Sequence, residues 1–306
     1  MEFFNPNSKI DFMGARKWAA VLSAIMFAFS LLSLSIYGLK WGLDFTGGSQ
    51  IEVHYPHSVD LQQIRDQLTK AGFPASTQVL SYGTSQDVLI SVAPRENMDP
   101  GVIVNQVMSA LPGGEKRRND IVGPQVGQEL ATKGALAIVV SLLATMIYIA
   151  LRFEYRFAVS STVALIHDPV LILGIFSWFQ IEFDLKALAA LLAVIGYSLN
   201  DTIVVFDRVR ENFRKIRKST PLEIMNASIN QTLSRTIMTS LLTLIVVVAL
   251  FVYGGEAIHG FALALMIGII VGTYSSIYVA GALAIQMGLS SIDLMPSQKQ
   301  EFEERP

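Results

Sequence analysis

The sequence predicts an α-helical integral membrane protein with six membrane-spanning helices and one small α+β domain outside the membrane. The first indication is composition: of 306 residues, 52% are hydrophobic and only 16% are charged, and the mean hydropathy is +0.46. The second is a series of six apolar segments, each near the ~20 residues that cross a hydrocarbon core of ~30 Å. The third is one long insert, residues 40–133, in which strand and helix patterns alternate.

The first apolar segment covers residues 18–39, with Trp18 and Tyr37 near its ends, where aromatic residues suit a membrane interface. It is longer than the apolar core of a typical signal peptide and no A-x-A-like site follows it, so we expect a retained membrane anchor. The basic pair before it predicts a cytoplasmic N-terminus. Residues 1–39 are therefore assigned to that terminus and the first span.

The insert at 40–133 has the element order β-α-β-β-α-β, which favours a ferredoxin-like α+β domain. The expected strands lie at 50–55, 77–82, 88–93 and near 119–126, and the two helices begin after Ser58 and Asp99. Because the insert follows a span that leaves the cytoplasm, we expect it on the outer, periplasmic side. Its Lys and Arg residues do not oppose this, since long domains cross membranes largely regardless of charge.

The remaining five spans fall within residues 134–289, and residues 290–306 form a short polar tail. The apolar segments lie at 135–151, 158–179, 187–206, 237–253 and about 260–285. A basic inner loop is expected at 207–235. Clusters of Arg and Lys fall on alternate connections, which predicts that both termini are cytoplasmic.

Several classes of protein are excluded or disfavoured. The chain has no cysteine, which excludes disulfides, thiolate metal sites and a cysteine nucleophile. Its net charge of −2 gives no reason to expect nucleic acid as a partner. The glycine-rich segment at 42–49 follows a membrane helix and lacks the Gly-Lys-Ser of a phosphate-binding loop. We see no metal-ligand spacing and no nucleophile–base pair, so no catalytic residue, metal or cofactor is predicted.

Asn200 and Asp201 stand side by side inside the fourth apolar segment. A carboxylate at the bilayer centre costs about 2.5–3.5 kcal/mol on insertion scales. A carboxyl group removed from water holds a proton more readily and releases it when water or a cation approaches. We therefore interpret Asp201 as a proton-carrying group, with Ser198, Asn200 and Thr202 as its hydrogen-bond partners. The alternative is a permanently neutral acid that only holds helices together.

Arg235 opens the fifth apolar segment. One interpretation is a cation that reaches the cytoplasmic interface and has no further role. The other is a mobile cation that pairs with Asp201 in one state and leaves it in another. Pairing favours the charged carboxylate, and withdrawal favours its protonation.

His167, Asp168 and Pro169 lie in the middle of the third apolar segment. Pro169 removes a backbone donor and can kink a helix, and a histidine titrates near neutral pH when unperturbed. A proton path and a structural network at a helix kink remain equally open. A simpler role is expected at three other places: Asp207 as a solvated helix-end charge, Gly268 with Gly272 as a helix-packing pair, and the basic run 208–218 as a topology signal.

Five blocks of the sequence together resemble one family. They are GLDFTGGS at 42–49, VGPQVGQEL at 122–130, IHDPV at 166–170, YSLNDTIVVFDRVREN at 197–212 and SRT at 234–236. In this order they resemble the SecF protein-export membrane proteins of the SecD/SecF family, in the resistance–nodulation–division superfamily. The resemblance implies a six-helix half of such a bundle, with the intramembrane aspartate of the family at Asp201 and its functional arginine at Arg235. Pro169 departs from the usual pattern and puts the local helix geometry in question.

The resemblance also implies a function. It indicates a bacterial inner-membrane subunit that works with SecD beside the SecYEG channel and the SecA motor, with YajC as a further candidate partner. Such a complex uses the proton gradient to help preproteins complete their translocation. The proton relay is then expected to use Asp201, Arg235, Asn200, His167 and Asp168, and membrane lipid surrounds the spans.

Two other classes of function remain open. Six spans could form half of a proton-coupled small-molecule efflux transporter, although the outer domain is small and no large apolar insert is present. A passive scaffold that only steadies a channel is equally compatible with the number of helices. Replacement of Asp201 and Arg235 separates a scaffold from a motor, because only a motor needs them.

Overall fold

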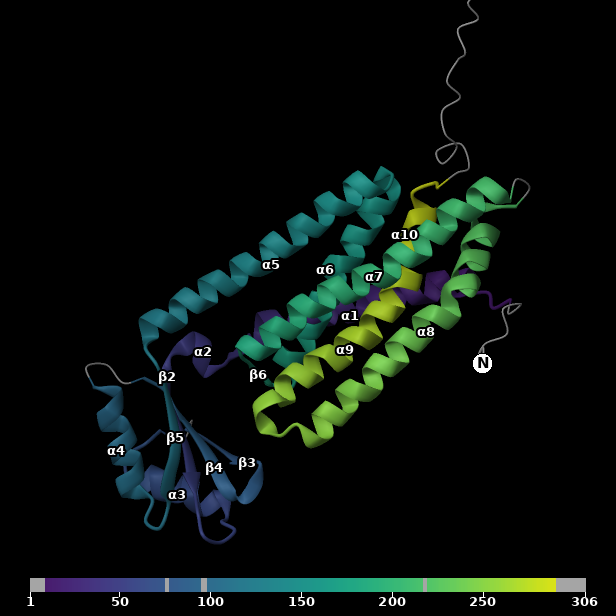
Figure 1. The fold of residues 1–306 in the computed structure, drawn as a ribbon. Coiled ribbons are helices and arrows are strands. Elements are labelled where there is room, and N and C mark those ends of the chain that lie inside the picture. Colours follow the sequence, from purple (N-terminus) through teal and green to yellow (C-terminus); the bar gives the residue numbers. More distant parts are fainter. Residues whose placement is uncertain (1–8, 75–76, 95–97, 217–218, 290–306) are drawn as a thin grey trace, which may run out of the picture.

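The computed structural model describes residues 9–74, 77–94, 98–216 and 219–289. The first eight residues, two basic residues of the 208–218 run and the tail 290–306 lie outside this part of the chain. The described residues form a bundle of long helices with a separate α/β domain at one end (Figure 1). We call this end of the bundle the domain end and the opposite one the far end.

Six helical segments among the described residues are long and apolar enough to cross a membrane, which confirms the predicted number. They are α1 (Arg16–Ile36, after the 3₁₀ turn η1, Met13–Ala15), α5 (Pro124–Arg152), α6 (Tyr155–Trp178), α7 (Leu185–Lys215), α8 (Pro221–Tyr253) and α9 (His259–Ser275), the last extended by the π-helical turn η3 (Ser276–Ala280) and α10 (Gly281–Gln286). Helices α6, α7 and α9 are the most buried, whereas α1, α5 and α8 expose most of their apolar surface. In Figure 1, α5 and α8 lie at the edges of the bundle with α7 and α9 between them. Polar side chains on the inward faces of α6, α7 and α9 are therefore shielded by the protein itself.

The predicted inner loop at 207–235 is wrong, because α7 continues to Lys215 and α8 begins at Pro221. Helix α7 extends past its apolar segment with ion pairs such as Glu211 to Lys215 (2.6 Å), one turn apart. A capping box closes the start of α8. Arg235 consequently lies well inside α8 rather than at its beginning.

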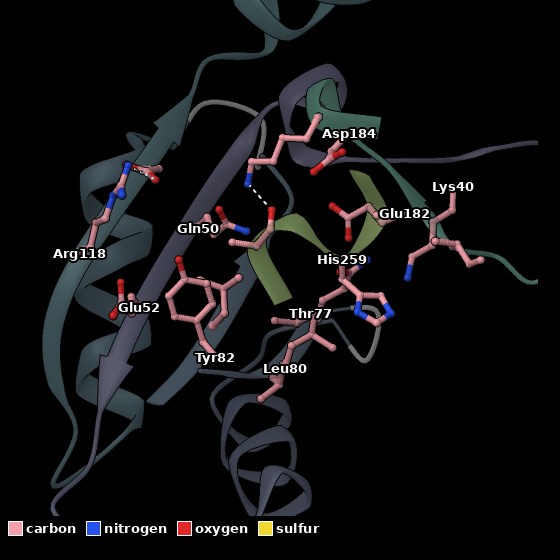
Figure 2. Close-up of a pocket in the computed structure, with 18 of the residues that line it drawn as sticks. Lys40, Gln50, Glu52, Thr77, Leu80, Tyr82, Arg118, Glu182, Asp184 and His259 are labelled. Atoms are coloured by element: carbon pink, nitrogen blue, oxygen red, sulfur yellow. Dashed lines mark hydrogen bonds and ion pairs between the residues drawn. The ribbon is translucent and has the colours of Figure 1, made fainter. Parts of the chain in front are cut away.

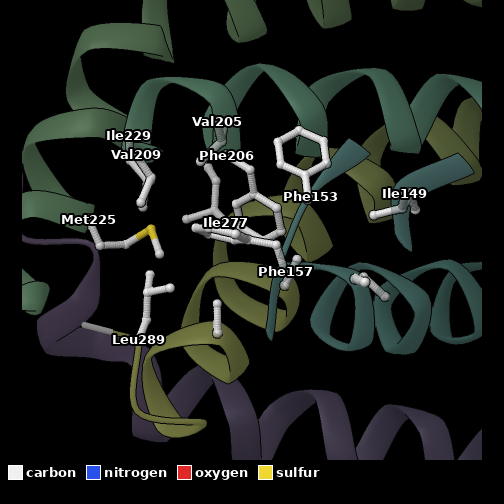
Figure 3. Close-up of a cluster of buried hydrophobic side chains, with 14 of the residues drawn as sticks. Ile149, Phe153, Phe157, Val205, Phe206, Val209, Met225, Ile229, Ile277 and Leu289 are labelled. Carbon is white, nitrogen blue, oxygen red and sulfur yellow. The ribbon is translucent and has the colours of Figure 1, made fainter. Parts of the chain in front are cut away.

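A cluster of buried apolar side chains holds the far end together (Figure 3). The rings of Phe157 on α6 and Phe206 on α7 lie 4.6 Å apart between centroids, and Phe153 packs against both. Met225 from α8 and Leu289 after α10 belong to the same cluster. Tertiary packing of this kind explains why the helices continue beyond the residues that hydropathy alone assigns to the spans.

The domain outside the bundle has the predicted order of elements. These are β2 (Gly48–His54), α3 (Leu61–Lys70), β3 (Gln78–Tyr82), β4 (Thr84–Val92), α4 (Pro100–Ala110) and β5 (Glu115–Val122). Asp99 caps α4 as expected, by accepting from the backbone N–H of Gly101. The cap of α3 is Asp60 rather than Ser58, and β5 ends before Pro124 because that proline begins α5.

The four strands form an antiparallel sheet in the order β3-β4-β2-β5. Alternate residues such as Ile51, Val53 and Ile90 are fully buried and pack against the inner faces of α3 and α4. Both helices therefore cover the same face of the sheet. The other face is polar and looks toward the helix bundle (Figure 2).

Three short elements form the base of this domain. Strand β1 (Lys40–Trp41) pairs in parallel with β6 (Glu182–Phe183), which lies between α6 and α7. The single-turn helix α2 (Leu43–Thr46) follows β1 and packs against α5. Helix α5 starts inside the region that the sequence assigned to the outer domain, so its first turns stand beside this base.

Candidate functional site

Asp168 is the centre of a polar network inside the bundle. Its side chain is 1% exposed. One carboxylate oxygen, Oδ2, accepts hydrogen bonds from the hydroxyl of Ser198 on α7 (2.6 Å) and from that of Ser275 on α9 (2.8 Å). Its Oδ1 lies 3.0 Å from Nδ1 of His167. The carboxylate thus connects the three innermost helices at the depth where lipid surrounds the bundle.

His167 completes one side of this network. Its ring stacks on Phe27 of α1, with the centroids 6.1 Å apart and the planes inclined by 6°. The second ring nitrogen, Nε2, is buried and has no hydrogen-bond partner. A buried polar atom without a partner is uncommon and costs free energy, so this nitrogen has an unused capacity for a hydrogen bond. Helix α6 runs without interruption through Pro169.

Asp201 lies one turn along α7 from Ser198 and is 3% exposed. Ser240 of α8 lies within hydrogen-bonding reach of its carboxylate, and the charge of Arg235 acts on it. Its Oδ2 is buried and has no hydrogen-bond partner among the described residues. Ser240 also contacts Thr273 of α9, with the two hydroxyl oxygens 2.8 Å apart. This second carboxylate therefore faces α8 and α9, whereas Asp168 faces α7 and α9 from α6.

A further hydroxyl contact joins α7 to the π-helical turn. The hydroxyls of Thr202 on α7 and Ser276 in the π-helical turn are 2.9 Å apart. Ser276 also donates to the backbone carbonyls of Ser198 and Gly272. Hydroxyl groups both donate and accept, so this pair holds α7 to the π-helical turn whichever of the two donates.

The predicted site residues separate into two groups. His167, Asp168 and Asp201 are buried in the interior, whereas Asn200 and Arg235 are exposed on the surface of the bundle. No ion pair joins Arg235 to Asp201 in the part of the chain that the structure describes. The expected set of partners for Asp201 was wrong. Ser198 binds Asp168, the side chain of Thr202 meets Ser276, and Asn200 points outward, because neighbouring residues on a helix face different directions.

The sequence analysis missed the hydroxyls contributed by α8 and α9. The sequence does contain a pattern that indicates them, because Thr273, Tyr274, Ser275 and Ser276 form a polar run within an apolar span. The π-helical turn that begins at Ser276 adds to it, because such turns occur often at functional sites.

The glycine pair in α9 explains how these hydroxyls reach α7. A Cβ atom at Gly268 would overlap the side chain of Val194, and one at Gly272 would lie 3.0 Å from Cβ of Ser198. This confirms the predicted packing role of the pair. Close approach of α9 to α7 is consistent with the hydrogen bond from Ser276 to the carbonyl of Ser198.

Two further expectations can be compared with the structure. Asp207 forms an ion pair with Arg152 (3.1 Å) at the far end, with both side chains more than 40% exposed, as expected of a solvated charge. Among the described residues, no group of three or more His, Cys, Asp or Glu side chains is placed to hold a metal ion. The interior site holds two carboxyl groups and one imidazole.

Comparison with known families identifies relatives of this fold. Residues 103–290 match the family model described as protein export membrane protein SecD/SecF, C-terminal, and residues 32–55 match the SecD/SecF GG motif. The chain is 51% identical to the protein translocase subunit SecF of Vibrio alginolyticus over 97% of both chains. It is 44% identical to that of Pseudomonas aeruginosa over 97% of this chain and 98% of the relative.

Solved structures agree with this assignment. The crystal structure of SecDF from Thermus thermophilus, described as a translocon-associated membrane protein, matches with a TM-score of 0.82 and 34% identity. The match covers 93% of this chain and 39% of the larger SecDF chain. A structure of SecDF in a super-membrane-facing form matches with a TM-score of 0.70.

Proposed function

This chain belongs to the SecD/SecF family of protein-export membrane proteins, and from that premise we propose that it uses the proton-motive force to assist a late step of preprotein translocation. In this proposal it acts as a subunit beside SecD, in the bacterial inner membrane. The observation that supports it most strongly is Asp201, a carboxyl group buried in a membrane-spanning helix with one oxygen unpartnered. A group that costs so much to place in a membrane is a functional site by default.

The proposed proton step occurs at Asp201. Protonation removes the charge and the need for a cation nearby, and release restores both. One elementary charge that crosses 100 mV releases about 2.3 kcal/mol, which can bias a two-state element about fiftyfold. Helices α7, α8 and α9 meet at this carboxylate through Ser240 and Thr273, so a change in its charge alters the packing of all three.

His167 and Asp168 are proposed to form a second part of the relay. The hydroxyls of Ser198 and Ser275 stabilise the charged carboxylate of Asp168, and the unpartnered nitrogen of His167 offers a place for a proton. The hydroxyls of Thr202, next to Asp201, and of Ser276, next to Ser275, are in contact. Exchange of a proton between Asp168 and Asp201 would link α6 to the movement of α7.

Asn200 and Arg235 take a different place in the proposal. Both are exposed on the bundle of a single chain, although an amide and a guanidinium are unfavourable against lipid. We assign them to the face that packs against SecD. There Arg235 would act on Asp201 as a cation whose distance changes as the two halves move.

The same proposal includes the orientation of the chain in the membrane. Both termini lie in the cytoplasm and the domain formed by β2–β5 lies in the periplasm, as the alternating basic clusters indicate. SecYEG, SecA, YajC and the translocating preprotein are the expected partners beyond SecD. The chain acts in transport without catalytic chemistry of its own and needs no metal or cofactor.

The test compares Asp201→Asn with Asp207→Asn in inverted membrane vesicles that carry SecD and the channel. Asp207 is the matched control, because it lies on the same helix but is solvated at the far end. Preprotein translocation is measured with ATP present, with and without an ionophore that collapses the gradient. Asp201→Asn should lose the gradient-dependent increment, and Asp207→Asn should keep it. Stimulation equal to the parent in Asp201→Asn would leave only a passive scaffold.

A further inference from the structure

Three segments far apart in the sequence meet at the base of the outer domain. The first contains β1 and α2, the second is the turn from β5 into α5, and the third is β6 with the start of α7. Two of them belong to blocks that the family resemblance highlighted but that the proton relay does not use. Their contacts suggest what they do.

Asp44 of α2 reaches the first turn of α7. Its Oδ2 accepts a hydrogen bond of 3.0 Å from the backbone N–H of Leu185, the first residue of that helix, 141 positions along the chain. The first N–H groups of a helix have no partner within it and attract negative charge. Asp184 also caps the helix, by accepting from the N–H of Ala187 at 2.7 Å. Helix α7 therefore has two acidic caps, one local and one from the base of the outer domain.

Backbone contacts strengthen the same connection. The parallel ladder pairs Lys40 with Glu182, and the N–H of Gly42 donates to the carbonyl of Phe183 at 2.9 Å. A Cβ atom at Gly42 would lie 3.0 Å from Cβ of Asp184, so the two chains touch. The segment that carries Asp44 is thus fixed to the entry of α7 by the residues that precede Asp44.

The segment also packs against the start of α5 and against the outer domain. Gly47 and Gly48 have φ values of +74° and +137°, which side chains other than glycine rarely adopt. A Cβ at Gly47 would lie 2.8 Å from Cα of Pro124, and one at Gly48 would overlap the carbonyl oxygen of Val92. A Cβ at Gly127 of α5 would lie 2.8 Å from the carbonyl oxygen of Phe45. Gly48 already belongs to β2, a central strand of the sheet, so the segment continues directly into the domain core.

The sheet meets the bundle differently elsewhere. Its polar face stands across a cavity of about 480 Å³ from the domain end, with Glu182, Asp184 and Lys40 on the bundle side (Figure 2). Gln78 of β3 bridges this space: its amide donates to Glu182 (2.8 Å) and accepts from Lys40 (3.0 Å). Burial raises the pKa of Glu182, and the charge of Lys40 opposes that rise. The domain is therefore closely packed at the Asp44 segment and separated by a polar cavity beside it.

We propose that Asp44 is a positioning residue that makes the start of α7 and the outer domain move as one body. Helix α7 is continuous from Leu185 to Asp201, a length of about 24 Å at 1.5 Å per residue. A shift of α7 at Asp201 is then delivered to β2 through Asp44 and the ladder. This inference rests on the proposed function and adds the structural link through which it acts.

The first experiment measures the connection itself, independently of proton coupling. The chain has no cysteine, so spin labels can be placed at Gln63→Cys, exposed on α3 of the outer domain, and at Ala189→Cys on the exposed side of α7, in protein reconstituted with SecD. The distribution of label distances should be narrow in the parent and should broaden in Asp44→Ala. It should stay narrow in Asp184→Ala, the matched control that removes the local cap of the same helix. Equal distributions in parent and Asp44→Ala would overturn the proposal.

The second experiment measures how loss of the Asp44 contact affects translocation. Gradient-dependent translocation should fall at least about fivefold in Asp44→Ala, the lower end of typical coupling between sites. Proton release from the lumen of the inverted vesicles should persist. Asp44→Asn, which retains an acceptor oxygen, should restore most of the stimulation. Equal losses in Asp44→Ala and Asp184→Ala would show that Asp44 is only a helix cap and would overturn the proposal.

A cross-link provides a control for misfolding. Lys40 and Glu182 are paired in the ladder, where neighbouring strands lie about 4.8 Å apart, within the range that a disulfide spans. In Asp44→Ala with Lys40→Cys and Glu182→Cys, oxidation should restore stimulation and reduction should remove it. If the cross-link forms and stimulation does not return, the result would contradict a mechanical role for Asp44.

The two proposals fail in different ways. If Asp201→Asn abolishes stimulation while Asp44→Ala keeps it, the positioning role is wrong and the proton coupling stands. If Asp201→Asn keeps full stimulation, the proton coupling is wrong. The label distances still decide whether Asp44 joins the two bodies.

Discussion

The hydroxyl of Ser198 donates to Oδ2 of Asp168 at 2.6 Å, one helical turn along α7 from Asp201. Helix α7 therefore presents a hydroxyl to one buried carboxylate and a carboxylate of its own to α8. Any rotation or translation of α7 changes the surroundings of both acids together. This arrangement makes α7 the element whose position the protonation of the interior can control.

Removal of the Ser198 hydroxyl should destabilise the bundle. Ser198→Ala takes one of two hydroxyl donors from a fully buried carboxylate, which typically costs about 1–3 kcal/mol. Thermal unfolding in detergent measures the change against Ser35→Ala. Ser35 is a suitable control because it is exposed on α1 and donates only to the carbonyl of Leu31. Equal melting temperatures for the two variants would contradict the role assigned to the Ser198 bond.

Replacement of Gly268 by alanine should loosen the contact between α9 and α7. The added Cβ would overlap Val194. The shifts of side chain and backbone that remove such an overlap typically destabilise a protein by about 1–3 kcal/mol. Gly196→Ala is the matched control, because a Cβ there meets no atom within 4 Å. Combining Gly268→Ala with Val194→Ala should recover part of the loss in a double-mutant cycle. Additive effects in that cycle would show that the two residues do not interact.

Loss of the positive charge at Arg235 should reduce gradient-dependent translocation, because its charge acts on Asp201 from an exposed position on α8. Arg235→Lys should retain more stimulation than Arg235→Ala, since it keeps a cation. Arg152→Ala is the control: this arginine is also exposed but pairs with Asp207 at the far end. Translocation assays with and without the gradient measure the difference. Identical results for Arg235→Ala and Arg152→Ala would remove Arg235 from the relay.

The outer domain should lose stability in acid through Asp87. Hydrogen bonds from Thr84 (2.6 Å) and His54 (2.7 Å), with the charge of Arg117, hold the pKa of this buried carboxyl below its usual value. Because the pKa of Asp87 is lower in the folded state, the stability that its charged carboxylate contributes is fully present above the unfolded pKa of about 3.9. That stability is lost as the pH falls through the pKa of the folded state.

Hydrogen exchange of residues 48–122 in the reconstituted protein, corrected for intrinsic rates, should therefore show weaker protection below about pH 4. Asp87→Asn should be less stable than the parent at pH 7, and the two should converge in acid. Asp66→Asn is the control, because Asp66 is exposed on α3. A constant difference between parent and Asp87→Asn across this pH range would disprove the linkage.

Much of the architecture could be predicted from local patterns. Six apolar segments, the strand and helix periods of the insert, and the cap at Asp99 all depend on neighbours in the sequence, and the structure agrees with them. The ends of α7 and α8 could not be predicted in this way. They extend into polar residues because Phe206, Met225 and Phe157 bury each other at the far end, a contact between distant segments.

The sequence alone determined that a carboxylate at position 201 lies within a membrane helix, because hydrophobicity fixes which residues enter a bilayer. Only the tertiary structure decided that Ser198 serves Asp168, that Asn200 faces outward, and that Asp44 caps a helix 141 positions away. The reason is that the rotation of a helix about its axis, and the approach of distant segments, follow from the packing of all neighbours together. No local pattern carries that information.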